Sequence, residues 1–460
     1  MSRQFKTVDY EAALNQTVRL GDCLPPDHLA RFIVDVIAHL DLSAIYARYK
    51  SRGGAPYAPE LLFGLLAYGY ATGVFSSRKI ERATYEAAPF RFIAGNLHPD
   101  HDTIASFRRT FLPELQDLFV QLLLLAQEMG VLKLGTISID GTKLHADASK
   151  SKAVSYKRLL QLETHLRAEV AALFALGAHA DQASLPDGMV VTHELALREE
   201  RLARLAEAKA VLVARALHRD ALEQAEYEAK LREREAKEQR TGKKPRGKPP
   251  TPPTPGPRDD DQYNFTDPDS RIMKNSTDKG FNQHYNAQVA VEQESLLIVG
   301  TSLSNHPTDQ AEIVPTVEAI PDVLGVPGAA ALDQGYFSAG NIATLEGLGI
   351  EPYIATGREP HQLNWEAYFA EAPTPPASDA SPREQMAYKL RTEIGREIYR
   401  LRKCTVEPVI GVIKEVLGFR QFSLRGLGGA AGEWVLVCLA CNLKRLQVLC
   451  KGELRLAMVG

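Results

Sequence analysis

The stretch TISIDGTKLHADASK, residues 136–150, joins a short apolar run to a single acid. From Thr136 to Ile139 polar and apolar side chains alternate, and this period of two predicts a β-strand with one buried face. Asp140 and Gly141 then break the alternation and predict the end of the strand. An Asp-Gly pair is common in turns. Alternatively, an acid at a rigid strand end is an oxygen ligand for a metal ion, if other acids fold beside it.

A second strand with the same kind of ending lies far along the chain. GAAALDQGYFS, residues 328–338, is an apolar run that ends at Asp333, with a glycine two places on. Residues 281–305 alternate through two strands with a turn near Gln293–Ser295. A helix and a further strand are predicted over residues 339–356. The first strand is expected to pair with these later ones, so the predicted fold class is α/β.

A charged helical segment separates the first strand from the others. Residues 151–240 are rich in Ala, Leu, Glu and Arg, which are strong helix formers, and they predict a helical hairpin. Residues 241–274 begin basic and proline-rich and predict a solvated or extended linker. A sheet tolerates such an insertion where the ends of the interrupted chain lie close together.

The N-terminal part, residues 1–130, predicts an all-helical domain. Apolar residues recur at three- and four-residue spacings in residues 26–42 and 58–73, and shorter helical stretches follow. Arginines and lysines in those stretches, Arg108 and Arg109 among them, fit a helix-turn-helix-like DNA-binding module. A helical packing domain with an ordinary basic surface fits the same pattern, because helix spacing alone does not specify DNA.

Composition predicts a soluble globular protein of two or three domains, with 45% hydrophobic and 24% charged residues in 460. The cysteines give no disulfide framework. Cys438 and Cys441 lie in an apolar helical pattern and are predicted to belong to the core, so a reducing, cytoplasmic location is expected. The chain begins without a signal-peptide pattern, and no apolar run approaches the roughly 20 residues of a membrane span. No membrane partner is expected.

The net charge of −3 means that a nucleic-acid partner must bind to local basic patches. Residues 400–455 form such a patch, because ten Lys or Arg residues there face only four acids.

A third acid is expected from a helix in this patch. Hydrolysis of phosphodiesters needs two hard cations roughly 4 Å apart, and carboxylates from separate elements can share them. Glu407 is the candidate, and Lys414 shares its helix face seven residues on. Pro408 predicts that the helix begins near Thr405, so that Tyr399–Lys403 belong to a preceding segment at another angle. Taken singly, each acid is equally well explained as a turn or surface residue.

In combination, the stretches around Asp140, Asp333 and Glu407 resemble those of the DDE transposases of bacterial insertion sequences. Within that family the chain is most similar to the group with a Tyr-Arg-Glu-Lys signature, in the subgroup named after insertion sequence 1182. The signature maps to Tyr399, Arg402, Glu407 and Lys414, with one residue more than usual before the glutamate, so that Lys403 stands where the stricter spacing has arginine. The other blocks that carry the resemblance are residues 61–83, 98–109, 138–150, 267–291 and 332–338.

The resemblance implies an RNase H-like mixed sheet flanked by helices, with an all-helical N-terminal domain and a charged helical insertion. The catalytic domain would comprise residues 131–150 and 275–460. Asp140, Asp333 and Glu407 would gather in one cluster and bind two Mg²⁺ ions, with Mn²⁺ as a substitute.

Further residues receive roles from the same resemblance. Tyr399, Arg402, Lys403 and Lys414 would grip DNA phosphates. His145, Asp147 and His284 lie near the blocks and are expected to be scaffold.

The implied activity is cleavage at the terminal inverted repeats, followed by attack of the 3′-hydroxyl on target DNA by at least a dimer. Two alternatives stay open. One is an RNase H-like nuclease without strand transfer, and the other is a non-catalytic DNA-binding derivative.

Overall fold

The computed structural model describes residues 19–49, 54–178, 190–242, 247–274, 280–357 and 380–452, with a few isolated positions between and beyond them. The chain divides into two compact units. The core unit comprises residues 1–146 and 285–460, and the insertion unit comprises residues 147–284.

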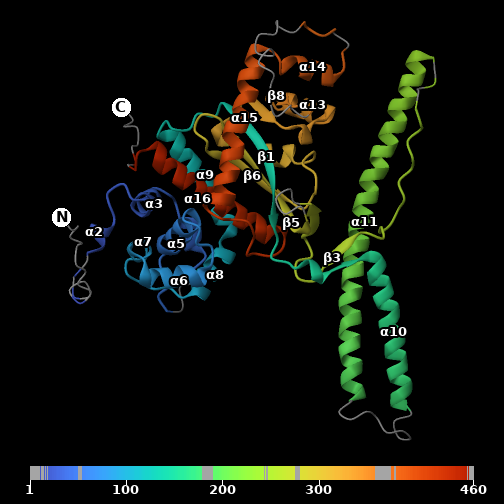
Figure 1. Cartoon of the computed structure of the whole chain (residues 1–460), viewed down its shortest axis with the longest axis horizontal. Coiled ribbons are helices and arrows are strands. Elements are labelled where there is room, and N and C mark those ends of the chain that lie inside the picture. The colour runs from blue at the N-terminus through green and yellow to red at the C-terminus, as the bar shows by residue number, and fades with distance from the viewer. Residues whose placement is uncertain are drawn as a thin grey trace, which may run out of the picture. The chain divides into compact units, whose positions relative to one another are not determined.

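A mixed β-sheet lies at the centre of the core unit (Figure 1). Its order is β6 (Ile298–Ser304), β5 (Phe281–Glu292), β1 (Thr136–His145), β7 (Ala329–Leu332) and β8 (Glu351–Ile354). β5 and β6 are antiparallel, whereas β7 is parallel to both β1 and β8. The first strand of the chain therefore pairs with strands from beyond the insertion, as predicted, and the turn between β5 and β6 falls where the sequence placed it.

β1 does not end at Asp140, and that prediction is wrong. The strand continues through Gly141 to His145, where its main chain pairs with the segment after Lys414: His145 N donates to Arg420 O, and Phe422 N donates to His145 O. The Asp-Gly pair lies within the strand and makes no turn. The missing side chain of Gly141 leaves room for the Gln288 amide of β5.

Helices cover the sheet and fill the rest of the core unit (Figure 1). The N-terminal helices are α2 (Leu20–Cys23), α3 (Leu29–Ile37), α4 (Ser43–Ala47), α5 (Pro59–Ala71), α6 (Ser77–Glu86), α7 (Ala88–Ile93), α8 (His101–Thr110) and α9 (Leu112–Glu128). The later ones are α12 (Ile313–Glu318), α13 (Ala339–Gly347), α14 (Pro382–Lys389), α15 (Glu393–Gly411) and α16 (Leu427–Leu449). Short 3₁₀ turns lie at Asp322–Leu324 and Gln334–Tyr336.

The hydrophobic core is built around α16, which packs against α5, α9 and β6. Trp434 is fully buried on α16, and Cys438 and Cys441 are buried free thiols on the same helix. The core interpretation of the two cysteines is therefore confirmed. Burial raises the pKa of the Cys441 thiol to about 12, so the thiol stays protonated and inert.

The insertion unit contains the predicted antiparallel helical hairpin of α10 (Tyr156–Ala178) and α11 (Val191–Thr241) (Figure 1). Leu159, Leu166, Leu205 and Leu212 close an apolar seam between the helices. Short strands β2 (Ala153–Ser155) and β3 (Gln262–Asn264) pair at its base, β4 (Arg271–Lys274) pairs with the start of β5, and a 3₁₀ turn spans Lys150–Lys152.

Ion pairs flank the hairpin seam and set its register. Glu163 bonds Lys209 at 2.8 Å, and Glu169 bonds Arg198 at 2.7 Å. The linker after α11 runs extended, because Arg219 and Asp220 hold it at Asp261 and Gly256. Within the described ranges of either unit, no helix is long and apolar enough to cross a membrane.

Candidate active site

The register of two parallel strands brings the first two acids together. Ile139 of β1 pairs with Leu332 of β7, so the residues that follow, Asp140 and Asp333, lie opposite each other. Asp333 caps the 3₁₀ turn after β7, where its Oδ1 accepts a 2.7 Å hydrogen bond from Gly335 N. Asp140 Oδ1 accepts from Gly141 N at 2.8 Å. Sheet geometry thus fixes the two acids that the sequence placed at similar strand ends.

Glu407 projects from α15, which packs on β1 and β7. α15 is continuous from Glu393 to Gly411 with Pro408 inside it, so the predicted break before Thr405 is wrong. An internal proline costs a helix roughly 3 kcal/mol, and contacts with the sheet offset that cost. One such contact is buried, since Thr405 Oγ1 lies 2.8 Å from Ser138 Oγ, two residues before Asp140.

Arg402 connects the helix acid to the sheet acid. Its Nη2 donates to Glu407 Oε1 at 3.2 Å, and its Nη1 lies 3.5 Å from Asp140 Oδ2. The residue is only 6% exposed. Within the described part of the chain, Arg402 Nε and Nη1 have no hydrogen-bond partner. A buried guanidinium with unused N–H groups therefore lies among the acids, where an anionic oxygen would satisfy it.

The ring of Tyr399 lies next to this arginine. The Arg402 guanidinium lies 5.8 Å from the centre of the Tyr399 ring. Tyr399 is itself buried against Ala331 of β7 and Tyr353 of β8. Tyr399 is only 9% exposed, and its expected contact with a DNA phosphate stays a prediction.

The electrostatics of the site are those of crowded negative charge. Burial, together with nearby Asp333 and Asp309, raises the pKa of Asp140 to about 6 against the opposing effect of Arg402. The pKa of Tyr336, which is fully buried beside the same acids, is raised well above its usual value by burial and by Asp140. An excess of negative charge of this kind is relieved by binding a cation.

The donor atoms fit a hard divalent cation in kind, because all are carboxylate oxygens. However, no three His, Cys, Asp or Glu side chains in the described residues are close enough together to hold a metal ion. Asp140 and Asp333 are adjacent, whereas Glu407 reaches them through Arg402. The expected tight cluster of three acids is thus replaced, in this arrangement, by two aspartates and an arginine-linked glutamate.

Two further cations of the signature region lie at the surface of α15 and after it. Lys414 belongs to a π-helical turn, Val412–Val416, and its Nζ donates to Thr142 Oγ1 of β1 at 3.0 Å. The change from α to π geometry means that the predicted common face of Glu407 and Lys414 does not follow from a 3.6-residue period. Lys403 is exposed.

Arg108 and Arg109 differ in burial. Arg108 is buried, donates to Tyr70 Oη at 2.7 Å and lies 3.6 Å from Glu433 Oε1 on α16. The expected DNA contact of Arg108 is therefore corrected to a structural ion pair. Arg109 is exposed on α8 and remains available at the surface.

The residues expected to be scaffold lie near the ends of strands. His145 ends β1, and its main chain makes the pairing described above. His284 is fully buried in the insertion unit, with Nδ1 2.7 Å from Asn282 O. Asp147 begins the insertion unit.

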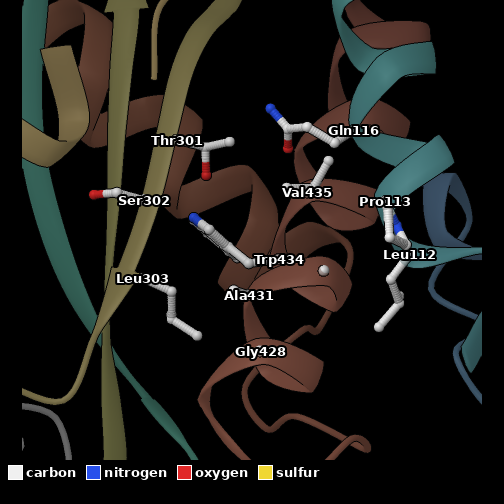
Figure 2. Close-up of a pocket in the computed structure, with 11 residues that line it drawn as sticks. Leu112, Pro113, Gln116, Thr301, Ser302, Leu303, Gly428, Ala431, Trp434 and Val435 are labelled. Atoms are coloured by element: carbon white, nitrogen blue, oxygen red, sulfur yellow. The ribbon is translucent and has the colours of Figure 1, made fainter. Parts of the chain in front are cut away.

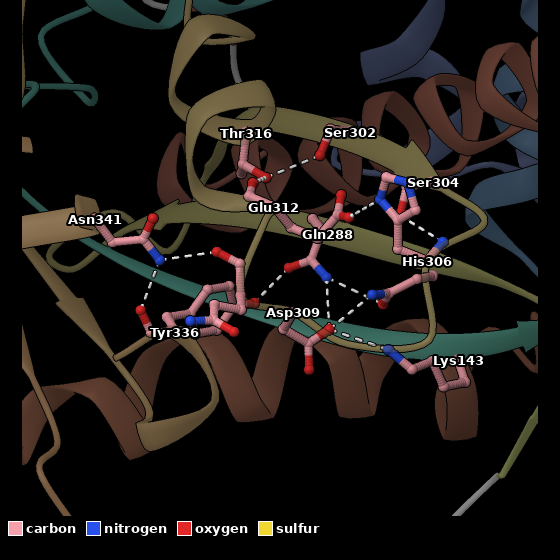
Figure 3. A network of polar contacts seen from close by, with 12 residues as sticks. Lys143, Gln288, Ser302, Ser304, His306, Asp309, Glu312, Thr316, Tyr336 and Asn341 are labelled. Atoms are coloured by element: carbon pink, nitrogen blue, oxygen red, sulfur yellow. Dashed lines mark hydrogen bonds and ion pairs between the residues drawn. The ribbon is translucent and has the colours of Figure 1, made fainter. Parts of the chain in front are cut away.

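Sequence reasoning missed a group of polar residues around Asp309, which includes Gln288 and Tyr336 (Figure 3). The signal was present in β5, where Asn286 and Gln288 interrupt an apolar strand two places apart and hence on one face. Both are fully buried. Polar side chains at buried strand positions need partners, and those partners lie at the site.

A pocket of about 300 Å³ lies elsewhere, between α9, β6 and α16 (Figure 2). Its lining is mostly apolar, with Leu112, Leu303 and Trp434 among its walls. None of the predicted site residues lines it, so it is separate from the acids.

Two family models match the chain. A transposase domain family (DUF772) matches residues 18–110, and a transposase DDE domain family matches residues 376–447, which include Tyr399, Arg402, Glu407 and Lys414. No curated protein and no solved structure matches the chain significantly. The two matched domains indicate a transposase with a DDE domain.

Proposed function

We propose that this protein is a DNA transposase of the insertion sequence 1182-like subgroup, which cuts DNA at insertion-sequence ends and joins the freed 3′-hydroxyl to target DNA. The observation that carries the proposal is the register of β1 and β7, which sets Asp140 opposite Asp333, with Glu407 tied to Asp140 by Arg402. Carboxylates are the kind of ligand that two-cation phosphodiester chemistry uses, and here two come from the ends of neighbouring strands and the third reaches them through Arg402.

The order of the sheet supports an RNase H-like catalytic domain. The first strand lies at the centre, with an antiparallel pair on one side and two parallel strands on the other. The insertion unit leaves the sheet directly after β1 and returns at β5. A catalytic domain interrupted in this way can keep its acids in place, because β1 is held by β7 independently of the insertion.

Asp140, Asp333 and Glu407 would hold two Mg²⁺ ions, or Mn²⁺ in their place. When bound, these ions lower the pKa of the attacking water and stabilise the leaving oxygen. Arg402 supplies unused N–H groups to a phosphate oxygen beside the acids. Lys403, four residues before Glu407 on α15, and Lys414, in the π-helical turn after α15, add positive charge for the DNA backbone. Joining two element ends requires at least two copies of the chain on DNA.

The test compares Asp140→Asn, Asp333→Asn and Glu407→Gln with the native protein, using a labelled donor end and a target plasmid in Mg²⁺. Each variant is expected to bind the end and to lose cleavage. Glu397→Gln, an exposed acid on the same helix, and Asp322→Asn, an exposed acid in a 3₁₀ turn, are matched controls and should cleave normally.

Two results would change the proposal. Full cleavage in Mg²⁺ by any of the three variants refutes the role of that residue. Cleavage of the donor end by the native protein without joining to the plasmid identifies a nuclease instead of a transposase.

A further inference from the structure

A polar network centred on Asp309 joins side chains of β1, β5 and the 3₁₀ turn after β7 (Figure 3). Asp309 follows β6, and its Oδ1 accepts three hydrogen bonds. The donors are Lys143 Nζ of β1 at 3.0 Å, and Asn286 Nδ2 and Gln288 Nε2 of β5 at 2.7 and 3.0 Å. The charge of Asp309 is thereby balanced by an ammonium group, and its position is fixed by two strands of the sheet.

Gln288 carries the connection onward. Its Oε1 accepts a hydrogen bond from the Tyr336 hydroxyl, and its Nε2 also lies 3.0 Å from Asn286 Oδ1. Tyr336 is fully buried and ends the 3₁₀ turn that Asp333 begins. The network therefore begins at Lys143, three residues after Asp140, and ends at Tyr336, three residues after Asp333.

A glycine makes room for this network beside Asp140. A Cβ at Gly141, directly after Asp140, would overlap the amide of Gln288. At Gly335, by contrast, a Cβ would be close only to Asp333 Oδ1, at 3.0 Å, and would lie at an ordinary contact distance of 3.8 Å from Asp309 Oδ2. Gly141 therefore allows the Gln288 amide to approach β1 closely, directly after Asp140.

We propose that Asp309 and Gln288 are positioning residues, which hold Asp140 and Asp333 at the spacing at which the two carboxylates share a divalent cation. The proposal rests on the proposed function, in which those aspartates bind metal. Asn286, Gln288 and Tyr336 are fully buried. This part of the network resists rearrangement, because turning the Gln288 amide breaks contacts on both sides at once. Asp309 acts through its neighbours, since three donors already occupy its Oδ1.

The test measures Mn²⁺ affinity by isothermal titration calorimetry on the full-length protein. Asp309→Ala and Gln288→Met should weaken Mn²⁺ binding by about 10- to 100-fold, the usual effect of losing an outer-shell partner. Asp309→Asn keeps an oxygen acceptor for Lys143 and Asn286, and should recover part of the affinity. Because the ligands themselves remain, DNA cleavage by all three variants should return as the Mn²⁺ concentration is raised.

Ser302→Ala is the matched control, because it removes a 2.8 Å contact with Thr316 in the same region without touching either aspartate. Its Mn²⁺ affinity should equal that of the native protein. Thermal melts show whether each variant folds. If Asp309→Ala does not fold, the Mn²⁺ affinity of Gln288→Met alone tests the positioning role.

Asp333→Asn separates the two proposals. Native Mn²⁺ affinity in both Asp309→Ala and Gln288→Met, with binding lost in Asp333→Asn, overturns the positioning role alone. Loss of binding in Asp309→Ala that excess Mn²⁺ does not restore makes Asp309 a metal ligand and also overturns it. Unchanged binding in Asp333→Asn removes the proposed function itself.

Discussion

Arg402 Nη2 donates a 3.2 Å hydrogen bond to Glu407 Oε1, five residues further along the same helix. The other terminal nitrogen of this guanidinium lies 3.5 Å from Asp140 Oδ2. A single buried cation thus holds an acid of the helix and an acid of the sheet in one place. Positive charge at this point opposes the binding of a divalent ion by the same carboxylates, and it also favours the approach of a phosphate.

Arg402→Gln is therefore expected to separate metal binding from catalysis. Mn²⁺ affinity should stay equal or become tighter, because a competing positive charge is removed. Cleavage of a donor end should fall by at least about tenfold, the typical cost of losing a charge-assisted contact to the reacting group. Titration calorimetry and a cleavage assay measure the two effects. Arg400→Gln, at the exposed neighbouring arginine, is the control, and loss of Mn²⁺ binding in Arg402→Gln would contradict the expectation.

Asp140 should make stability depend on pH in the absence of divalent ions. Burial raises its folded pKa to about 6, whereas an unfolded aspartate has a pKa of about 3.9. A raised folded pKa means that folding favours the protonated acid. The contribution of Asp140 to stability is then complete below about pH 4 and is lost as the pH rises through about 6.

Asp140→Asn removes that dependence, because asparagine does not ionise. In EDTA, its free energy of unfolding should exceed that of the native protein by roughly 1–3 kcal/mol above pH 6. The difference should shrink towards zero near pH 4. Thermal or urea melts across this range measure it, with Asp322→Asn as control. A constant difference at all pH values would mean that titration of Asp140 is not its source.

Gly141→Ala tests the close approach of Gln288 to β1. The added methyl group would overlap the Gln288 amide, so the amide must leave Asp309 or Tyr336. Overpacking of this kind costs roughly 1–3 kcal/mol, and end cleavage should fall with it. At Gly135, just before β1, a Cβ would meet nothing closer than 3.9 Å. Gly135→Ala should therefore leave both the stability and the end cleavage unchanged. Native cleavage by Gly141→Ala would show that the site tolerates movement of Gln288.

Arg108 and Arg109 are adjacent in sequence and should give opposite phenotypes. Arg108→Ala leaves the fully buried Glu433 without its cation, and loss of one partner of a buried ion pair costs about 3 kcal/mol or more. Arg109→Ala, at an exposed position, should change stability by less than about 0.5 kcal/mol. If Arg109 contacts a phosphate, its loss should also lower the salt dependence of DNA binding by about one unit of slope. Melting curves and salt titrations of DNA binding distinguish the two variants.

The elements that the sequence predicted correctly are those whose patterns report local burial. Alternation identified the strand at residues 136–139, and unbroken apolar runs identified β7 and the buried thiols of α16. The richness of residues 151–240 in strong helix formers identified the hairpin of α10 and α11. In each case the signal lies in the local run of residues, so it needs no knowledge of the partner.

What the sequence determined by itself is therefore the kind of the main sheet strands and of the hairpin helices, and the acids that the strands and α15 carry. Only the tertiary structure decided that β1 continues past Asp140, that Pro408 lies inside a helix, that Arg108 is buried, that β3 and β4 form in the predicted linker, and that Gln288 joins Asp309 to Tyr336. The physical reason is that each of these outcomes depends on a partner residue, which neutralises a charge or occupies the space beside it. Those partners, such as Gln288 for Gly141 and Glu433 for Arg108, lie more than a hundred residues away in the chain.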